Sequence, residues 1–253
     1  MGKKAKHPVQ TTAKTLEIIE AIKSLGGAGV TELADEVAMG KSAVHNHLST
    51  LEEYEYVSKV DGEYSLGLRF LEIGGYTRKE MDLFGIAKPQ VDELAEETGE
   101  LVNVAVEEHG RCVYLYRSRG TKAVNLDIYA GLRAAMNTTA LGKSMLAHMP
   151  DERVDEILAE ESFDPATANS ITDPAELREE FSQIRDQGYA VDDEELMKGL
   201  RCVSAPILSD EEVVGAISIS APTSRLKGKR LEEQFPDQVI SAANVIELNI
   251  AHS

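Results

Sequence analysis

Carboxylate, thiol and hydroxyl side chains with the chemistry of a ligand site gather in the C-terminal part of the sequence. Residues 188–207 read GYAVDDEELMKGLRCVSAPI, with adjacent carboxylates at Asp192 and Asp193 and a thiol at Cys202. Residues 216–222 read AISISAP and carry hydroxyls at Ser218 and Ser220, which are two apart and so lie on one face of a strand. These groups could converge on one polar ligand. The alternative is that the strand hydroxyls only satisfy each other's hydrogen bonds.

Cys202 lacks the context of a catalytic nucleophile. A catalytic thiol needs a nearby base, and of the six histidines only His109 and His148 lie outside the front segment and the tail. Neither has a spacing that pairs it with Cys202. We therefore expect a buried or pocket-lining thiol and no enzymatic activity.

Residues 137–144, NTTALGKS, end like a phosphate-binding loop. The motif G-x-x-x-x-G-K-[ST] requires glycine where Asn137 stands, and no strand rich in β-branched residues leads into it. Thr138 or Thr139 is better suited to cap a helix whose first N–H groups attract an anion. The segment therefore predicts an anion-attracting helix start and no bound nucleotide.

A second set of polar side chains suits contact with DNA. In residues 41–57, KSAVHNHLSTLEEYEYV, an apolar stripe at helical spacing is formed by Val44, Leu48 and Leu51. Short polar side chains near a helix start can bind phosphate while Asn or His reaches base edges. Polar residues on any exposed helix look similar, and many domains of this kind bind only other proteins. The candidate DNA-contacting residues are Lys41, Ser42, His45, Asn46 and Ser49.

The elements around this helix predict a winged helix-turn-helix. Residues 11–25 have apolar side chains at helical spacing and are followed by two glycines. Thr31 is the expected N-cap of a short second helix, and Ser42 is the expected N-cap of the third. Residues 56–67 then predict a hairpin about an Asp-Gly turn.

Residues 68–100 predict a connector of two helices. The helical pattern is interrupted by Gly74-Gly75 and by Pro89, a residue that suits the first turn of a helix. The first helix has more apolar surface than a linker needs, so we expect it to contact a second copy of the chain. Its apolar residues are Leu68, Leu71, Met81 and Leu83.

Residues 101–253 predict an antiparallel sheet flanked by helices. Alternating segments on both sides of His109-Gly110 and of residues 209–212 indicate two hairpins. This order is typical of an α+β sensor-like fold, which often encloses a small cavity. The expected helices lie near residues 141–148, 151–160, 174–187 and 229–250.

The charge is unevenly spread along the chain. The 253 residues have a formal net charge of −18, but residues 1–79 hold 10 Lys and Arg against 11 Asp and Glu, whereas residues 80–253 hold 16 against 33. Such an acidic body is typical of a protein kept soluble in concentrated intracellular salt, with a generic acidic cytosolic protein as the alternative. At about 1 M salt the Debye length is about 3 Å, so the acidic body would hardly repel DNA from the near-neutral front segment.

Composition also limits the location and the cofactors. Two cysteines are too few for a disulfide framework, and no C-x-x-C or H-x-x-x-H spacing predicts zinc. No apolar run of about 18 residues predicts a membrane span, and the start MGKKAKHPVQ lacks the apolar core of a signal peptide. We expect a cytoplasmic protein without a metal or a cofactor.

Several of these motifs, in this order, resemble the IclR family of transcription regulators. They are VTELADEVAMGKSAVHNHLSTLEEYEYV, the wing ending YSLG, TTALGKSMLA and GYAVDDEELMKGLRCVSAPILSDEEVVGAISIS, and the resemblance covers about Thr12 to Ile250. It implies homodimers, or dimers of dimers, whose winged domains bind a palindromic operator. It also implies a C-terminal GAF-like domain that binds a small, commonly acidic metabolite.

The resemblance further implies which residues bind that effector. It places Ala140 and Leu141 at a helix N-terminus in the pocket. One wall would hold Asp192, Leu200 and Cys202, and another Ser218 and Ser220. The apolar side would be closed by Leu126, Tyr129 and Ala134.

These observations predict an α+β protein of three parts. They are a winged helix-turn-helix at residues 1–67, linker helices at 68–100 and an effector domain with an antiparallel sheet at 101–253. We expect a sequence-specific DNA-binding transcription regulator controlled by a small metabolite. The alternatives are a constitutive DNA-binding factor with a vestigial pocket and a thiol-dependent enzyme on the same fold.

Overall fold

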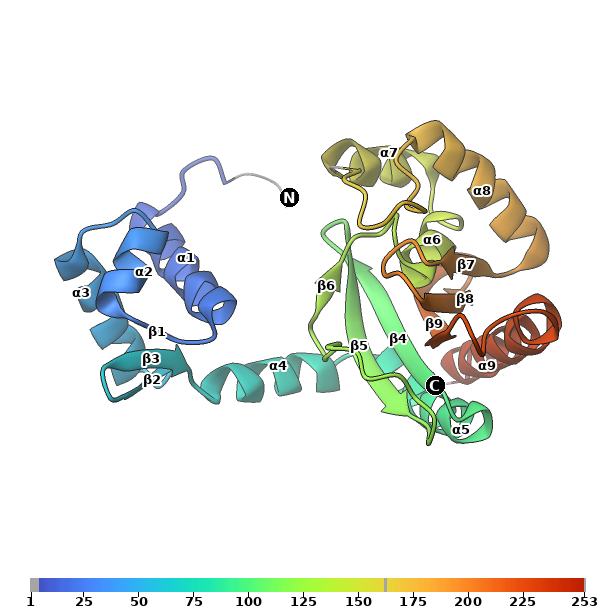
Figure 1. Ribbon diagram of the computed structural model, residues 1–253, viewed down its shortest axis with the longest axis horizontal. Coiled ribbons are helices and arrows are strands. Elements are labelled where there is room, and N and C mark those ends of the chain that lie inside the picture. The colour runs from blue at the N-terminus through green and yellow to red at the C-terminus, as the bar shows by residue number, and fades with distance from the viewer. Residues whose placement is uncertain (1–4, 162, 253) are drawn as a thin grey trace. The chain divides into compact units, whose positions relative to one another are not determined.

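The computed structural model describes residues 5–161 and 163–252 and divides the chain into two compact units (Figure 1). One unit ends at Glu80 and the other begins at Met81. Each unit has its own buried apolar core, as expected of separate domains.

The first unit is a winged helix-turn-helix, as predicted. Its strands form an antiparallel sheet in the order β1-β3-β2. Asp61 and Gly62 have φ angles of 52° and 91°, which suit a two-residue hairpin turn between β2 and β3. The elements are α1 (Gln10–Leu25), β1 (Ala28–Gly29), α2 (Val30–Glu36), α3 (Lys41–Glu53), β2 (Val57–Val60), β3 (Glu63–Leu66) and α4 (Arg69–Lys79).

One apolar face of each of the first three helices forms the core of this unit. Ile18 and Ile22 of α1 pack with Leu33 of α2, and all three are at most 1% exposed. Val44 and Leu48 of α3 are fully buried in the same cluster. Because these two residues point inward, the opposite face of α3 is exposed to solvent.

Two helix starts differ from the prediction. The N-cap positions are Gly29 for α2 and Gly40 for α3, and neither helix has a side-chain cap. The prediction of Thr31 and Ser42 as N-caps is therefore wrong, since each lies in the first turn of its helix. The Ser42 hydroxyl consequently stays on the exposed surface of α3.

The connector also differs from its prediction. α4 runs through Gly74 and Gly75 without a break, and α5 (Asp82–Thr98) has Pro89 in its interior rather than in its first turn. Leu83 is 7% exposed and belongs to the core of the second unit, so it is not part of the surface of α4. Tertiary burial of α5 outweighs the cost of one interior proline.

The second unit is built on a six-stranded antiparallel sheet. Both predicted hairpins are present, and their turn residues at 109–110 and 210–211 all have φ between 50° and 75°. In spatial order the strands are β6 (Arg133–Ala134), β5 (Arg111–Arg119), β4 (Leu101–Glu108), β9 (Glu212–Pro222), β8 (Leu200–Ser209) and β7 (Ala190–Asp193).

Helices cover both faces of this sheet (Figure 1). α5 packs on one face together with α9 (Phe235–Ile250), which follows the π-helical turn η1 (Arg230–Gln234). The other face is covered by α6 (Ala140–Leu146), α7 (Asp151–Glu160) and α8 (Pro174–Gln187). The bounds of α7 and α8 match the predicted ranges.

Strand alternation sorts apolar from polar side chains between the two faces. Val104, Val203 and Ile217 belong to the cluster formed with α5 and α9. Their chain neighbours Ser204 and Ser218 therefore point to the side of α6. The polar side chains of the sheet are thus collected beneath α6.

Candidate DNA-binding surface and effector-binding face

The exposed face of α3 carries all five residues predicted to contact DNA. The buried stripe of Val44, Leu48 and Leu51 fixes the helix on the core and turns the polar side chains outward. This face carries no carboxylate before the last turn of the helix. The predicted residues, all exposed, are Lys41, Ser42, His45, Asn46 and Ser49.

A groove of about 360 Å³ without any charged carboxylate lies between α1 and α3. It is lined by Thr11, Thr15, Ala43, Asn46, His47 and Thr50. The Thr15 hydroxyl donates to the Thr11 carbonyl at 3.0 Å, so it accepts from Nδ1–H of His47 at 2.8 Å. This bond fixes the ring of His47 and leaves Nε2 for another partner. His47 was not among the predicted DNA contacts, because its link to Thr15 joins residues far apart in sequence.

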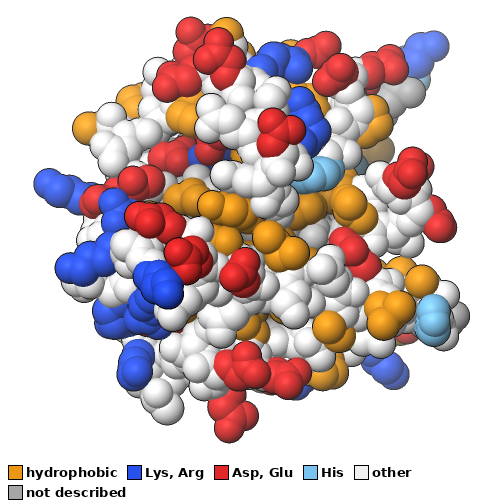
Figure 2. All heavy atoms as spheres, turned by 90° about the vertical axis from the view of Figure 1, so that its right-hand side faces the viewer, with side chains coloured by type: hydrophobic (Ala, Val, Ile, Leu, Met, Phe, Trp, Pro, Cys, Tyr) orange, Lys and Arg blue, Asp and Glu red, His pale blue; other side chains and the backbone are white. Residues whose placement is uncertain are grey.

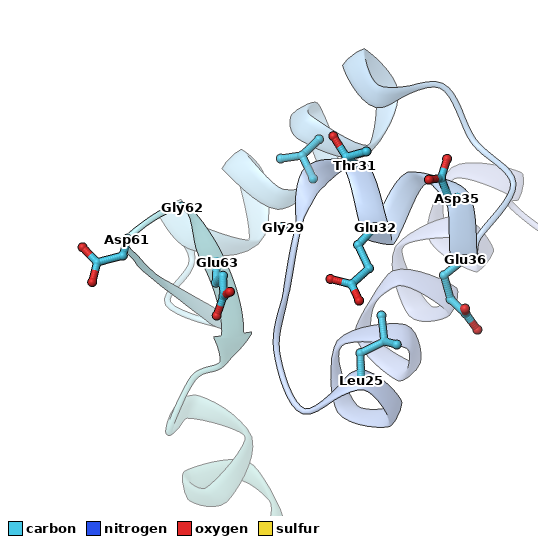
Figure 3. A pocket seen from close by; sticks show the side chains of 10 residues that line it. Leu25, Gly29, Thr31, Glu32, Asp35, Glu36, Asp61, Gly62 and Glu63 are labelled. Carbon is cyan, nitrogen blue, oxygen red and sulfur yellow. The ribbon is translucent and has the colours of Figure 1, made fainter.

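A larger groove on the same unit has the opposite character. It has a volume of about 950 Å³ and lies between α2 and the hairpin turn of the wing (Figure 3). Glu32 of α2 and Glu63 of β3 stand on its two sides (Figure 3). The carboxylates that line it are Glu32, Asp35, Glu36, Asp61 and Glu63. Five carboxylates on one groove disfavour phosphate groups there.

Three of the four predicted polar effector residues form one row across three strands of the second unit. The register places Asp192 of β7 opposite Cys202 of β8, and Cys202 opposite Ser220 of β9. The Cys202 thiol donates to Ser220 Oγ at 3.1 Å. Asp192 and Ser220 are 1% and 3% exposed, so the row is closed off from bulk water.

A second polar row lies beside the first and includes residues that the sequence did not single out. Ser204 of β8 is opposite the predicted Ser218 of β9, which is opposite Asn103 of β4. Ser204 Oγ lies 3.0 Å from Ser144 Oγ of α6, which ties the helix to the sheet. The only sequence signal for Asn103 is that it interrupts the apolar run LVNVAV.

The start of α6 stands over this face. Thr139 caps the helix by accepting from the Gly142 N–H at 3.0 Å, which confirms the predicted cap. Ala140 and Leu141 are 1% and 2% exposed, and Leu141 belongs to the apolar cluster on this side of the sheet. The helix has only seven residues, so its dipole is a weak source of attraction for an anion.

Lys143, the lysine of the sequence that resembles a phosphate-binding loop, has a different role. Its ammonium is fully buried and lies 2.6 Å from Glu180 of α8 and 2.5 Å from Glu195 after β7. These ion pairs occupy the ammonium, so Lys143 is a structural link between α6, α8 and the β7–β8 segment.

Two carboxyl groups at this end of the sheet have raised pKa values. Burial raises the pKa of Asp192 to about 6, although the N–H groups of Glu195 and Leu196 and the charge of Lys143 act against it. Burial also raises the pKa of Glu195 to about 7, against the attraction of Lys143. Asp192 Oδ1 accepts the Glu195 N–H at 2.7 Å, which fixes the turn after β7.

The two cysteines are poorly suited to nucleophilic chemistry. Burial raises the pKa of Cys112 to about 12 and that of Cys202 well above its usual range. His148, one of the two candidate bases, is bound through Nδ1 to the Ser144 carbonyl at 2.8 Å. Thiolate formation near neutral pH is therefore suppressed at both positions.

The predicted apolar side of the site is only partly assembled. Ala134 of β6 is opposite Cys112 of β5, and Leu200 is 4% exposed beside the first polar row. The Leu126 carbonyl accepts from Arg117 at 3.0 Å, so Arg117 holds the loop after β5. Tyr129 in this loop is 44% exposed.

The surface of the second unit is acidic but interrupted by apolar side chains. Figure 2 shows the side that carries α8 and α9, where an apolar band separates groups of Asp and Glu side chains. Lys and Arg side chains gather at one edge of this view (Figure 2). The carboxylates are therefore spread over the face rather than collected in one patch.

Neither a membrane span nor a metal cluster is found in the parts of the chain that the structure describes. No helix within residues 5–161 and 163–252 is long and apolar enough to cross a bilayer. In the same residues no three His, Cys, Asp or Glu side chains come together as metal ligands do.

A DNA-reading winged domain joined to a separate domain with a buried polar face defines a ligand-responsive transcription regulator. Comparison with known families agrees with this class. The family described as bacterial transcriptional regulator IclR C-terminal matches residues 75–248, and the IclR helix-turn-helix domain matches residues 11–61. The chain therefore belongs to the IclR family of DNA-binding transcriptional regulators, which have a C-terminal effector-binding domain and are not enzymes.

Individual relatives match over nearly the whole chain. The chain is 34% identical over 247 residues to the "Probable HTH-type transcriptional regulator ArcR" of Halobacterium salinarum, covering 96% of this chain and 94% of that protein. It is 31% identical to the transcriptional repressor IclR of Escherichia coli, covering 95% and 89%.

Solved structures share the fold. The IclR of Thermotoga maritima matches with a TM-score of 0.77 at 30% identity, over 95% of this chain and 98% of that chain. An IclR homologue from Microbacterium hydrocarbonoxydans, solved in complex with 4-hydroxybenzoate, matches with a TM-score of 0.81 at 21% identity, over 96% and 100%. The predicted family and fold are thereby confirmed.

Proposed function

We propose that α3 reads an operator through Lys41, Ser42, His45, Asn46 and Ser49, with the groove between α1 and α3 receiving one DNA strand. The contrast between the two grooves of the winged unit carries this assignment. The groove beside α3 has no carboxylate, whereas the groove between α2 and the wing has five. A polyanion is favoured at the first and disfavoured at the second.

The effector is proposed to be a small organic acid bound beneath α6. Ser218 and Ser220 offer hydroxyl donors on a buried polar face that also holds the Cys202 thiol, and the N–H groups of Ala140 and Leu141 belong to the first turn of the helix above it. The remaining residues proposed for this site are Leu126, Tyr129, Ala134, Asp192 and Leu200. Binding of 4-hydroxybenzoate by the structural neighbour from Microbacterium hydrocarbonoxydans supports an organic acid as the class of ligand.

α4 is proposed to form the contact between two copies of the chain. No residue of this helix is buried, yet it carries several large apolar side chains. Leu68 and Leu71 are 82% and 70% exposed and lie along one stripe with Gly75, at positions i, i+3 and i+7. A second copy of α4 would cover this stripe, and Gly75 would allow the two helices to approach closely.

Regulation would follow from differential affinity. An effector that binds one relative placement of the two winged domains better than another shifts the population toward it. Operator half-sites about one helical turn apart, or a multiple of it, fit only one placement. The acidic body is proposed to work in a salt-rich cytoplasm, where screening limits its repulsion of DNA.

Selection of bound DNA by the purified full-length chain tests the operator assignment. The wild type is expected to enrich one palindromic sequence from genomic fragments, and Asn46→Ala to lose this enrichment. Glu36→Gln, which removes a charge from the acidic groove, is the matched control and should enrich the same sequence. Equal enrichment by Asn46→Ala and the wild type would remove α3 from the proposal.

Metabolite addition to the same assay tests the effector assignment. A change in operator affinity with one organic acid is expected. If a panel of organic acids changes neither the operator affinity nor the melting temperature, the chain is a constitutive DNA-binding factor.

A further inference from the structure

The second unit contains buried hydrogen-bond acceptors that have no partner. Within the residues that the structure describes, four buried side-chain oxygens lack a hydrogen-bond partner, and all four are acceptors in the second unit. Two of them are carboxylate oxygens of Glu180 and Glu195, whose other oxygens are paired with Lys143. The other two are the amide oxygens of Asn103 and Asn137, and no ion pair accounts for them.

Asn103 lies within the face proposed for the effector. It is 1% exposed on β4, opposite Ser218, and its Nδ2 lies 3.4 Å from Ser220 Oγ. Its two chain neighbours are Val102 and Val104, which are fully buried in the apolar core on the other face of the sheet. A buried amide with an unpaired oxygen is costly, and an apolar residue of similar size would avoid the cost.

Asn137 is the second buried amide with an unpaired oxygen. It is 2% exposed and lies in the segment that leads into α6, whose capping residue Thr139 follows two positions later. Its neighbour Met136 belongs to the apolar cluster on the α6 side of the sheet. The second unpaired amide thus lies just before α6, the helix that covers this face of the sheet.

An ionised carboxylate cannot satisfy these oxygens. At neutral pH it only accepts hydrogen bonds, and so does an ionised Asp192 in the first polar row. A hydroxyl group can donate to an amide oxygen and can accept from the neighbouring serine hydroxyls at the same time. The face beneath α6 therefore has a surplus of acceptors that hydroxyl groups of a ligand would match.

We infer that the effector is a hydroxylated organic acid, and that Asn103 determines its selection by accepting a hydrogen bond from a ligand hydroxyl. This inference rests on the proposed function of the face beneath α6. The carboxylate of the ligand meets the serine hydroxyls and the first N–H groups of α6. The hydroxyl group meets Asn103 Oδ1, and a second hydroxyl, where present, meets Asn137 Oδ1.

Matched pairs of acids test the inference with the full-length chain. The probes are glycerate and propionate, 3-hydroxybutyrate and butyrate, gluconate and hexanoate, and 4-hydroxybenzoate and benzoate, each titrated by calorimetry. In at least one pair the hydroxylated acid is expected to bind about 10-fold tighter or more than its deoxy partner. In Asn103→Leu this ratio should fall to within about 3-fold.

Control variants keep the result interpretable. Asn249→Leu makes the same change at an exposed position of α9 and should leave the ratio as in the wild type. Asn103→Ala repeats the test with a smaller side chain if Asn103→Leu does not fold, as judged by its melting curve. A ratio that persists in both Asn103 variants would overturn the role of Asn103.

The outcomes separate the inference from the proposed function. If acids bind but the deoxy members bind as tightly as the hydroxylated ones, the inference fails and the organic-acid effector stands. Such a result would mean that water satisfies the two amides. If no acid of either series binds, the organic-acid effector fails and the inference fails with it.

Discussion

Lys143 and Glu195 form a buried ion pair in which Nζ of the lysine lies 2.5 Å from Oε1 of the glutamate. Both side chains are closed off from solvent, with 0% and 7% of their surface exposed. Glu180 also pairs with Lys143, and the buried Asp192 carboxyl group lies close enough to act on the charge of Glu195. One ammonium thus faces three carboxyl groups, so the cluster has an excess of negative charge whenever all of them are ionised.

Removal of the Lys143 ammonium is expected to destabilise the second unit strongly. Lys143→Met keeps the length and the apolar stem of the side chain but leaves Glu195 and Glu180 without their partner. Breaking a buried pair from one side costs about 3–5 kcal/mol, and we expect a loss of this size in the free energy of unfolding measured with urea at pH 8. Lys229→Met, at a residue with 73% exposure, is the control and should change it by less than about 0.5 kcal/mol. Equal stability of the two variants would show that the ion pair contributes nothing.

The raised pKa of Asp192 predicts a pH dependence of stability. The pKa of about 6 in the folded chain lies above the ordinary value of 3.8, so folding favours the protonated form. The corresponding stability is fully present below the ordinary pKa and is lost as pH rises to about 6, after which it stays constant. Glu195, with its pKa of about 7, extends this loss to about pH 7.

Asp192→Asn tests this dependence because the amide oxygen can still accept the Glu195 N–H. Between pH 4.5 and pH 8 we expect the free energy of unfolding of the wild type to fall by about 1–3 kcal/mol relative to that of Asp192→Asn. Calorimetric melting at each pH measures this difference. Asp186→Asn, at an exposed position of α8, is the control and should follow the wild type. A constant difference between Asp192→Asn and the wild type over this range would contradict the raised pKa.

The turns of the fold were predictable from sequence because their signals are local. Asp61-Gly62 and His109-Gly110 place a glycine where a two-residue hairpin needs positive φ, and both hairpins are present. α5 was harder, because Pro89 suggests a helix start whereas the helix begins at Asp82. Its true extent depends on the burial of Leu83 and its neighbours against the sheet, which no local signal carries.

The site was predictable only in part for the same reason. Spacing places Ser218 and Ser220 on one face of a strand, but it does not say which strand lies next to them. The register that aligns Asp192, Cys202 and Ser220 is a tertiary property, and so is the ion pairing of Lys143. Sequence reasoning therefore identified residue types, whereas the structure shows which of them are neighbours.

The near-neutral winged unit predicts weak salt dependence of operator binding. Lys41 stands at the exposed start of α3, whereas Lys14 of α1 is already paired with Glu17 at 2.6 Å. Each cation that contacts a phosphate contributes a slope of about −0.9 in log affinity against log salt. Lys41→Gln should make the slope of log operator affinity against log salt shallower by about 1. Lys229→Gln, in the second unit, should leave this slope unchanged. An unchanged slope in Lys41→Gln would place the phosphate contacts elsewhere.

The exposed apolar stripe of α4 predicts that the chain dimerises through this helix. Leu71 is 70% exposed in the single chain, and exposed side chains of this size rarely gather on one helix without a partner. Leu71→Asp would bury an unpaired charge between two copies of α4, which is unfavourable enough to separate them. In sedimentation equilibrium we expect the wild type at twice the chain mass of 27.6 kDa and Leu71→Asp at the mass of one chain.

The dimer prediction has a control and a consequence for DNA binding. Val60→Asp, at an apolar residue of the wing with 68% exposure, should remain dimeric, because this residue lies on β2 and not on α4. Because one dimer places two reading helices on two half-sites, Leu71→Asp should bind a full palindrome no better than a single half-site. A monomeric wild type, or a Leu71→Asp variant that remains dimeric, would move the dimer contact away from α4. Full operator affinity in a monomeric Leu71→Asp would show that one winged unit suffices for recognition.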